Sequence, residues 1–199
     1  MRLEIEDTKW PKTLFDDEES REGKVHLSYV TKSLMDRAGI GYKGAGFNDM
    51  ELTAEIGLMW EDALSKIMGD RYATRPPHIE KDGIWMALDG IGPDPDGRVP
   101  LVVEEYKATW KSTKRPPTED FRYMVQVKSY CHAVGTPVAI MRIFHLMGDY
   151  RGSGPIYRVA RIEFDPYELE RNWEMVLNEK ERLIQEGKWH CKDSLDPRT

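Results

Sequence analysis

The chain has 199 residues, 40% of them hydrophobic and 10% aromatic, which excludes a disordered or low-complexity protein. Its formal net charge of −6 provides no overall positive field, so any contact with DNA must use a local basic patch. No apolar run approaches the roughly 20 residues that a membrane-spanning helix needs, and two cysteines favour a reducing cytoplasm over a disulfide scaffold. The length favours one domain over residues 1–199.

The first third of the sequence predicts a surface arm followed by two helices. Residues 1–24 are charged and have no apolar periodicity, so we expect an arm with little structure of its own. Ser28 can cap a short helix over 28–38, and the glycines of 39–48 predict a loop. Apolar residues at helical spacing over 51–68 predict a longer second helix.

The middle of the sequence has the pattern of strands. Residues 78–81 and 84–91 flank the turn Asp82-Gly83 and predict a hairpin. A second turn over 92–97 leads to a third strand over 99–109. These strands would form an antiparallel meander.

The last part alternates helices and strands. We expect a helix over 118–134, strands over 137–146 and 157–164, and an amphipathic helix over 166–185. The strand–helix–strand unit over 99–146 implies a right-handed crossover and local parallel pairing. The predicted fold is therefore α/β, with a mixed sheet flanked by helices.

The predicted strand over 99–109 carries the clearest functional pattern. Side chains alternate across a strand, so Glu105 and Lys107 lie on one face. The preceding strand ends its apolar run near Asp89, which hairpin pairing would place beside Glu105. Two carboxylates that meet at one point favour a hard divalent cation, whose charge offsets their repulsion.

A plain salt bridge at a strand end is the simpler interpretation of Glu105 and Lys107 taken alone. An acid two residues before a lysine occurs four times in this chain. Only this occurrence lies in a predicted strand with an upstream Asp-Gly and a following helix. That context favours the functional interpretation.

These residues resemble motifs of the PD-(D/E)XK nuclease superfamily, in particular its RecB-type and phage lambda-exonuclease-like branch. The resemblance covers roughly residues 50–146 and implies a restriction-endonuclease-like core. It rests on four segments: Gly57-Leu-Met-Trp-Glu61, Leu88-Asp89-Gly90, Val103-Glu104-Glu105-Tyr106-Lys107 and Gln126-x-x-x-Tyr130.

The resemblance implies a site for Mg²⁺ or Mn²⁺. Its ligands would be three carboxylates and one backbone carbonyl, from Glu61, Asp89, Glu105 and Tyr106. Two adjacent acids precede the lysine, which departs from the simplest motif; spacing selects Glu105, and alternation sends Glu104 to the opposite face. An exposed helix acid remains the alternative interpretation of Glu61.

The resemblance also implies the remaining catalytic roles. Lys107 would position or activate the attacking water, and Gln126 and Tyr130 would orient the site. Gln126 and Tyr130 are four residues apart on a helix and therefore neighbours, which ordinary helix-surface packing would also explain.

A local basic stretch follows the strand, as DNA contact would require. It contains Trp110, Lys111, Lys114 and Arg115 and no acid, so it could follow phosphates and stack on bases, although a solvated loop remains possible. Arg21 and Ser28 resemble the arginine and helix-start serine with which lambda-exonuclease-like enzymes hold a DNA 5′-phosphate.

Other chemistries fit poorly. The pairs Cys131-His132 and His190-Cys191 lack zinc-finger spacing, and two cysteines cannot hold the four-cysteine iron–sulfur cluster of some related nucleases. The glycines of 39–46 lack the lysine-serine ending of a phosphate-binding loop.

The sequence thus favours a cytoplasmic, metal-dependent exonuclease that acts on the ends of double-stranded DNA, in the host cytoplasm if a phage encodes it. The resemblance also implies a recombination partner that anneals single strands and a cyclic trimer. An endonuclease on the same fold, or an inactive nuclease fold that binds DNA or protein, are the alternatives.

Overall fold

The structure is a computed structural model, and the residues it describes are 23–40, 50–73, 75–152 and 154–188. The predicted N-terminal arm, except for its last two residues, and most of the predicted loop over 39–48 lie outside them. The elements in chain order are β1 (Val25–His26), α1 (Leu27–Arg37), α2 (Met50–Tyr72), β2 (Ile79–Lys81), β3 (Ile84–Met86), β4 (Gly90–Gly92), β5 (Val102–Thr109), a 3-10 turn η2 (Pro117–Glu119), α3 (Phe121–Val134), β6 (Val138–His145), β7 (Ile156–Glu163) and α4 (Pro166–Gln185).

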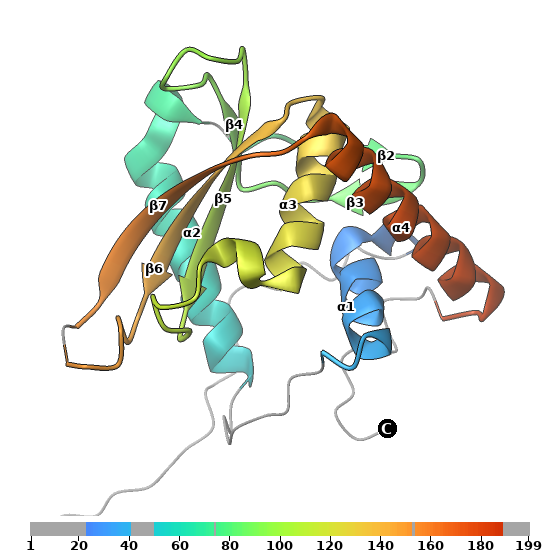
Figure 1. The fold of residues 1–199 in the computed structure, drawn as a ribbon, viewed down its shortest axis with the longest axis horizontal. Coiled ribbons are helices and arrows are strands. Elements are labelled where there is room, and N and C mark those ends of the chain that lie inside the picture. The colour runs from blue at the N-terminus through green and yellow to red at the C-terminus, as the bar shows by residue number, and fades with distance from the viewer. Residues whose placement is uncertain (1–22, 41–49, 74, 153, 189–199) are drawn as a thin grey trace, which may run out of the picture.

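The larger sheet has four strands in the order β4-β5-β6-β7 (Figure 1). β5 and β6 are parallel and joined through α3, whereas β4–β5 and β6–β7 are antiparallel. A short connection cannot join parallel neighbours, so the helix crosses over between them. The α/β fold with mixed pairing and flanking helices is confirmed.

The single strand expected over 84–91 is wrong in one respect. β3 ends at Met86 and belongs to a small sheet with the order β1-β3-β2, whereas β4 begins at Gly90 in the larger sheet. Residues 87–89 therefore cross from one sheet to the other. Leu88 is fully buried in this crossing, so the apolar run continues through the break and conceals it in the sequence.

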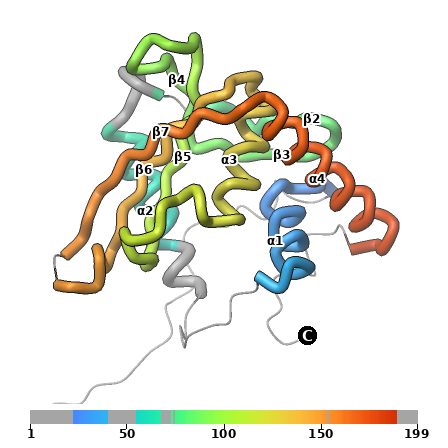
Figure 2. The backbone as a smooth tube through the Cα atoms, in the orientation of Figure 1, coloured from blue at the N-terminus to red at the C-terminus, as the bar shows by residue number. Residues whose placement is uncertain are grey.

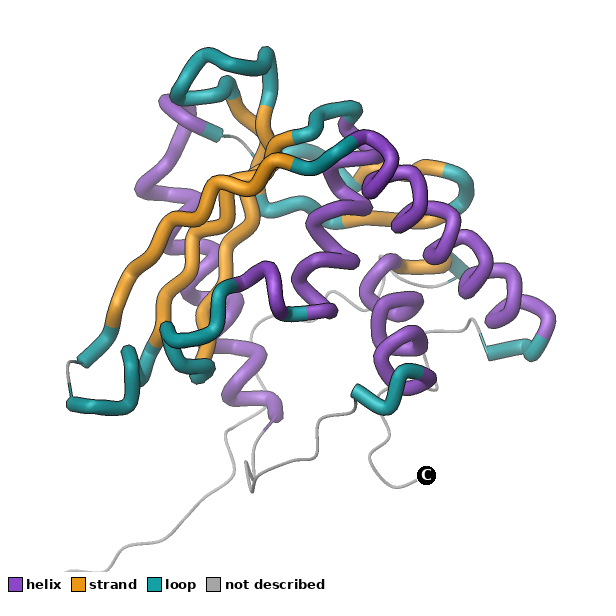
Figure 3. The backbone as a smooth tube through the Cα atoms, viewed as in Figure 1, coloured by secondary structure: helices purple, strands orange, loops and turns teal. Residues whose placement is uncertain are grey.

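The two faces of the larger sheet carry different helices (Figures 1 and 3). The main core joins Val103, Met141 and Ile143 to buried residues of α1, α3 and α4. On the opposite face Tyr106 packs against Leu64 and Trp60 of α2. β5 thus lies between α2 on one side and α3 on the other.

Local capping explains where the long helices begin. The Asp120 side chain accepts from the Tyr123 amide at the start of α3, and Asp165 forms a capping box with Glu168 at the start of α4. The expectation for Ser28 is wrong, because α1 begins at Leu27 and Ser28 already lies inside its first turn.

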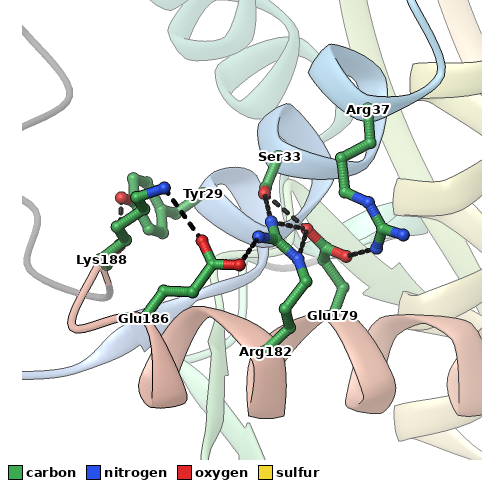
Figure 4. A network of polar contacts seen from close by, with 7 residues as sticks. All are labelled: Tyr29, Ser33, Arg37, Glu179, Arg182, Glu186 and Lys188. Carbon is green, nitrogen blue, oxygen red and sulfur yellow. Dashed lines mark hydrogen bonds and ion pairs between the residues drawn. The ribbon is translucent and has the colours of Figure 1, made fainter.

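An ionic network joins α1 to α4, which lie side by side near the two ends of the described chain (Figures 2 and 4). The buried Glu179 carboxylate of α4 accepts from Ser33 and Arg37 of α1, each at 2.5 Å. Arg182 also donates to it, at 2.5 Å. Burial opposes ionisation of Glu179, but these donors outweigh it and lower its pKa to about 2.

Candidate active site

Asp89 lies beside the strand that carries Glu105 and Lys107, as the hairpin prediction required. β4 begins at Gly90, which pairs with Glu104. The next free amide of β5, that of Tyr106, donates to the Asp89 carboxylate at 2.7 Å. The side chain of Asp89 therefore takes the place of a strand backbone at the point where the ladder ends.

Close packing at Gly90 fixes this arrangement. A Cβ at this position would lie 3.1 Å from the Ala73 Cβ, 3.2 Å from the Glu104 Cβ and 3.2 Å from the Tyr106 hydroxyl. Any larger residue would push the chain away from β5. The glycine after Asp89 is therefore needed to bring that carboxylate to the Tyr106 amide.

Glu105 is a fully buried carboxylate whose ion-pair partner is the Lys107 ammonium, two residues along the same face of β5. Lys107 contacts Oε1, and Oε2 has no hydrogen-bond partner within the described residues. Burial raises the Glu105 pKa to about 8, with Lys107 acting against the shift and Asp89 adding to it. A buried carboxylate with unused oxygens is costly unless a further cation joins it.

Glu61 reaches the same electrostatic environment from α2. Trp60 stacks on Phe144 of β6 with ring centroids 4.6 Å apart, and this contact helps to hold α2 against the sheet. Burial and the charge of Asp89 raise the Glu61 pKa to about 7, against the effects of Lys107 and of Arg75, whose Nη2 lies 3.8 Å from its carboxylate.

Lys107 is held as an ammonium by the acids around it. Burial alone would lower its pKa, but the charges of Glu105, Asp89 and Glu61 outweigh burial and raise it. The side chain is only 18% exposed, so its positive end stays at the acidic cluster. Lys107 is therefore a fixed hydrogen-bond donor in the field of Glu105, Asp89 and Glu61.

Gln126 and Tyr130 of α3 support the site through a chain of hydrogen bonds. Gln126 Nε2 donates to the Tyr130 hydroxyl at 2.8 Å, and that hydroxyl donates to the Ala87 carbonyl at 2.8 Å. Ala87 lies in the segment that leads to Asp89. α3 therefore fixes the segment that places the Asp89 carboxylate. Burial raises the pKa of the Tyr130 hydroxyl, and the nearby charge of Glu105 raises it further.

The donor set suits a hard divalent cation, because it consists of carboxylate oxygens. Glu105 supplies a buried carboxylate whose Oε2 has no partner within the described residues, and Asp89 adds a carboxylate oriented by the Tyr106 amide. The described residues do not bring three His, Cys, Asp or Glu side chains close enough together to enclose a metal ion. Water and substrate oxygens would have to complete the coordination, as is common for Mg²⁺.

Glu104 is directed to the opposite face, as alternation predicted. Its carboxylate accepts hydrogen bonds from Arg142 Nε at 2.6 Å and from Nη2 at 2.8 Å, which makes a bidentate ion pair within the sheet. Burial raises the Glu104 pKa and Arg142 counteracts the shift. This acid already has its partner and is not a candidate ligand.

The predicted basic stretch directly follows the C-terminal end of β5 and carries less free positive charge than its sequence indicates. The Lys111 ammonium pairs with Asp120, and Arg115 Nε lies 3.5 Å from Glu119. The exposed Lys114 forms no ion pair within the described part of the chain. The half-buried Trp110 is held near Tyr150, whose hydroxyl donates to its carbonyl.

The predicted 5′-phosphate pocket is not tested by the structure, because Ser28 is exposed on the first turn of α1 and Arg21 lies outside the described residues. His190 and Cys191 also lie outside them. The sequence analysis did not single out Arg75, which acts on Glu61, or His145, which ends β6 opposite Thr109. The position of His145 at the end of an apolar strand was the available signal for that residue.

Two mixed sheets, helices on both faces and a strand that carries the acid and the lysine together form a restriction-endonuclease-like fold. Two solved structures with this fold are those of the alkaline exonuclease LHK-Exo from Laribacter hongkongensis. The first matches with a TM-score of 0.53 and 18% identity, over 84% of this chain and 91% of the exonuclease. A complex of LHK-Exo with dAMP matches with a TM-score of 0.52 and 18% identity, over 85% and 93%.

Neither the models of known protein families nor the curated protein sequences give a match to this chain. The structural likeness therefore establishes the fold. Across the described residues, no helix is long and apolar enough to cross a membrane.

Proposed function

We propose that this chain is a metal-dependent deoxyribonuclease that hydrolyses DNA phosphodiester bonds from the ends of duplex DNA. One observation carries the proposal: a fully buried glutamate lies beside an aspartate in a fold shared with an exonuclease, and it pairs with the lysine two residues on while one of its oxygens has no partner within the described residues. A purely structural salt bridge would not leave a buried carboxylate oxygen without a partner.

The ligands proposed for Mg²⁺ or Mn²⁺ are Glu61, Asp89, Glu105 and the Tyr106 carbonyl. When bound, the cation would stabilise negative charge on the phosphate and increase the acidity of a water molecule. Lys107 would stay protonated and donate a hydrogen bond to the attacking water or to a phosphate oxygen, which orients the nucleophile. Gln126 and Tyr130 would act by holding the segment that places Asp89.

DNA is the proposed substrate, and the structure of LHK-Exo with dAMP supports a nucleotide-binding role for this fold. The decisive assay compares linear and closed circular duplex DNA, each with Mg²⁺ and with EDTA. We expect digestion of the linear form with Mg²⁺ alone. Digestion of closed circles would identify an endonuclease, and no cleavage with any divalent metal would leave only a binding module.

The proposed active form is a cyclic oligomer, most simply a trimer, around the duplex. The support is electrostatic: the chain is acidic overall, and two cations of its basic stretch are paired with acids. One subunit thus offers few phosphate contacts, and several subunits acting together would offer more. Light scattering at assay concentration tests this, since a monomer that digests DNA processively would contradict it.

The 5′-phosphate pocket of Arg21 and Ser28 also remains a proposal, supported by the resemblance of these two residues and by the exposure of Ser28. If it is correct, DNA ends that carry a 5′-phosphate will be digested faster than ends with a hydroxyl. Equal rates on the two ends would remove this pocket and leave the metal site unaffected.

A further inference from the structure

A small cavity of about 40 Å³ lies next to the candidate active site, between the end of β5 and the start of α3. The charged residues around it are Lys111, Arg115, Glu119 and Asp120, and Thr109, Ser112 and His145 add further polar groups. One water needs roughly 10–15 Å³ of such space, so the cavity has room for a few waters or for one phosphate group.

The cavity follows Lys107 along the same face of the strand. Thr109 is two residues after Lys107, which corresponds to about 6.8 Å along β5. Ile143, which also lines the cavity, is the residue of β6 that pairs with Lys107. DNA rises about 3.4 Å per nucleotide, so the cavity lies within about two nucleotides of a phosphate held at Lys107.

The groups that line the cavity suit an anion. Lys111 and Arg115 provide positive charge, and Thr109 and Ser112 provide hydroxyls. His145 is almost fully buried, and its Nδ1 lies 2.8 Å from the Lys111 carbonyl. A carbonyl only accepts, so the Nδ1 proton of His145 holds the Lys111 backbone in place, and the positive charge and hydroxyls of the other groups are what suit an anion.

Two acids at the start of α3 hold these cations. Asp120 pairs with Lys111, whose ammonium also lies 4.7 Å from the centre of the Tyr123 ring, and Glu119 pairs with Arg115 at 3.5 Å. The Arg115–Glu119 pair is exposed, at 77% and 56%, and in the other pair Lys111 is 47% exposed and Asp120 only 16%. Exposed ion pairs are weak, so a phosphate carrying full negative charge could replace the carboxylates.

We propose that this cavity binds a backbone phosphate of the cleaved DNA strand and that Asp120 and Glu119 hold its two cations until the phosphate replaces them. This inference rests on the proposed nuclease function and adds a second anchoring point to it. The acids then weaken binding, so removing them should strengthen it. A role limited to fixing the loop would give the opposite or no effect on DNA affinity.

The test measures binding of a fluorescently labelled duplex by anisotropy, with Ca²⁺ in place of Mg²⁺ and with the DNA checked to be intact. Asp120→Asn keeps an N-cap of equal strength, so α3 should stay folded. Glu119→Gln changes an exposed residue, and Lys111→Gln removes one cation. Glu168→Gln is the matched control, because it also frees a lysine, Lys128, from an ion pair of 3.1 Å while preserving the capping box of α4.

We expect Asp120→Asn and Glu119→Gln to tighten DNA binding by about twofold to fivefold each, the strength of an exposed ion pair. Lys111→Gln should weaken binding and reduce the slope of log K against log salt by about 0.9, one phosphate contact. Glu168→Gln should change neither.

Two results would overturn the inference. If the wild type cleaves linear DNA but neither acid-to-amide variant tightens binding, the phosphate site is wrong and the proposed function stands. If Glu168→Gln tightens binding as much as the other two, the effect is one of net charge and the cavity is not the site. A wild type that neither binds nor cleaves DNA would instead overturn the proposed function itself.

Discussion

Metal binding by this chain should depend steeply on pH between 6 and 9. Burial raises the pKa of Glu105 from its ordinary 4.5 to about 8 and that of Glu61 to about 7. Carboxylates bind Mg²⁺ only after losing their protons. Below these pKa values, the cation must therefore displace protons from both groups.

The size of the effect follows from the two shifts. Each pH unit below a pKa costs about 1.4 kcal/mol, so at pH 6 deprotonation costs about 2.7 kcal/mol at Glu105 and about 1.4 kcal/mol at Glu61. The sum, about 4 kcal/mol, corresponds to an affinity for Mg²⁺ roughly 10³-fold weaker at pH 6 than at pH 9. Release of nearly two protons per cation should accompany binding at pH 6, and almost none at pH 9.

Isothermal titration with Mg²⁺ at four pH values, in two buffers that differ in ionisation enthalpy, measures both the affinity and the proton release. Glu61→Gln serves as the internal control, because it should remove the shallower part of the pH dependence and leave that of Glu105. An affinity that changes less than about tenfold between pH 6 and pH 9 would refute the assignment of these buried acids as ligands.

The same shifts predict how the metal-free protein responds to pH, and three further predictions concern single residues. Because the folded-state pKa of Glu105 is raised, its contribution to stability is complete below pH 4.5 and is lost as the pH rises through about 8. The melting temperature of the metal-free protein should therefore fall over this pH range, and Mg²⁺ should reverse the fall. Lys107→Ala should reduce DNA hydrolysis by about 10²–10⁴-fold while DNA binding by the folded protein stays close to wild type, and near-normal turnover would exclude this lysine from the mechanism. Gly90→Ala should destabilise the fold by about 1–3 kcal/mol in urea unfolding, because its Cβ would lie 3.1 Å from Ala73 and 3.2 Å from Glu104; an unchanged midpoint would show that this contact is not tight. The pKa of Glu179 is lowered to about 2, so this group contributes stability that is present above pH 4.5 and is lost as the pH falls toward 2. Acid unfolding of the wild type, monitored by circular dichroism, should therefore begin at a higher pH than its stability at pH 7 alone suggests. Glu179→Gln should lower the free energy of unfolding at pH 7 by about 1–3 kcal/mol.

The placement of Asp89 beside β5 could be predicted because it depends on local rules. Alternation sorts Glu104 from Glu105, and a hairpin register brings Asp89 to the next strand. The helix α4 could also be predicted from the sequence, since Pro166 follows a capping aspartate and the apolar residues recur at helical spacing. These features are encoded within about 20 residues of sequence.

The features that could not be predicted depend on distant parts of the chain. The break at residues 87–89 leaves no trace in hydropathy, because Leu88 is as buried as the strands around it. The basic stretch contains no acid, yet Asp120 and Glu119, at the start of the next helix, form ion pairs with its Lys111 and Arg115. Which acid neutralises which cation is decided by the turn between them rather than by composition.

The hydrogen bond between the Tyr106 amide and the Asp89 carboxylate provides a direct way to observe the site. Other amides of β5 exchange with solvent hydrogen when the sheet opens, but this one is protected by a side chain. Its exchange rate should therefore report movements of Asp89 that leave the sheet intact. Exchange measured residue by residue would then show whether the carboxylate is already fixed before a cation arrives, which is the condition for a prearranged active site.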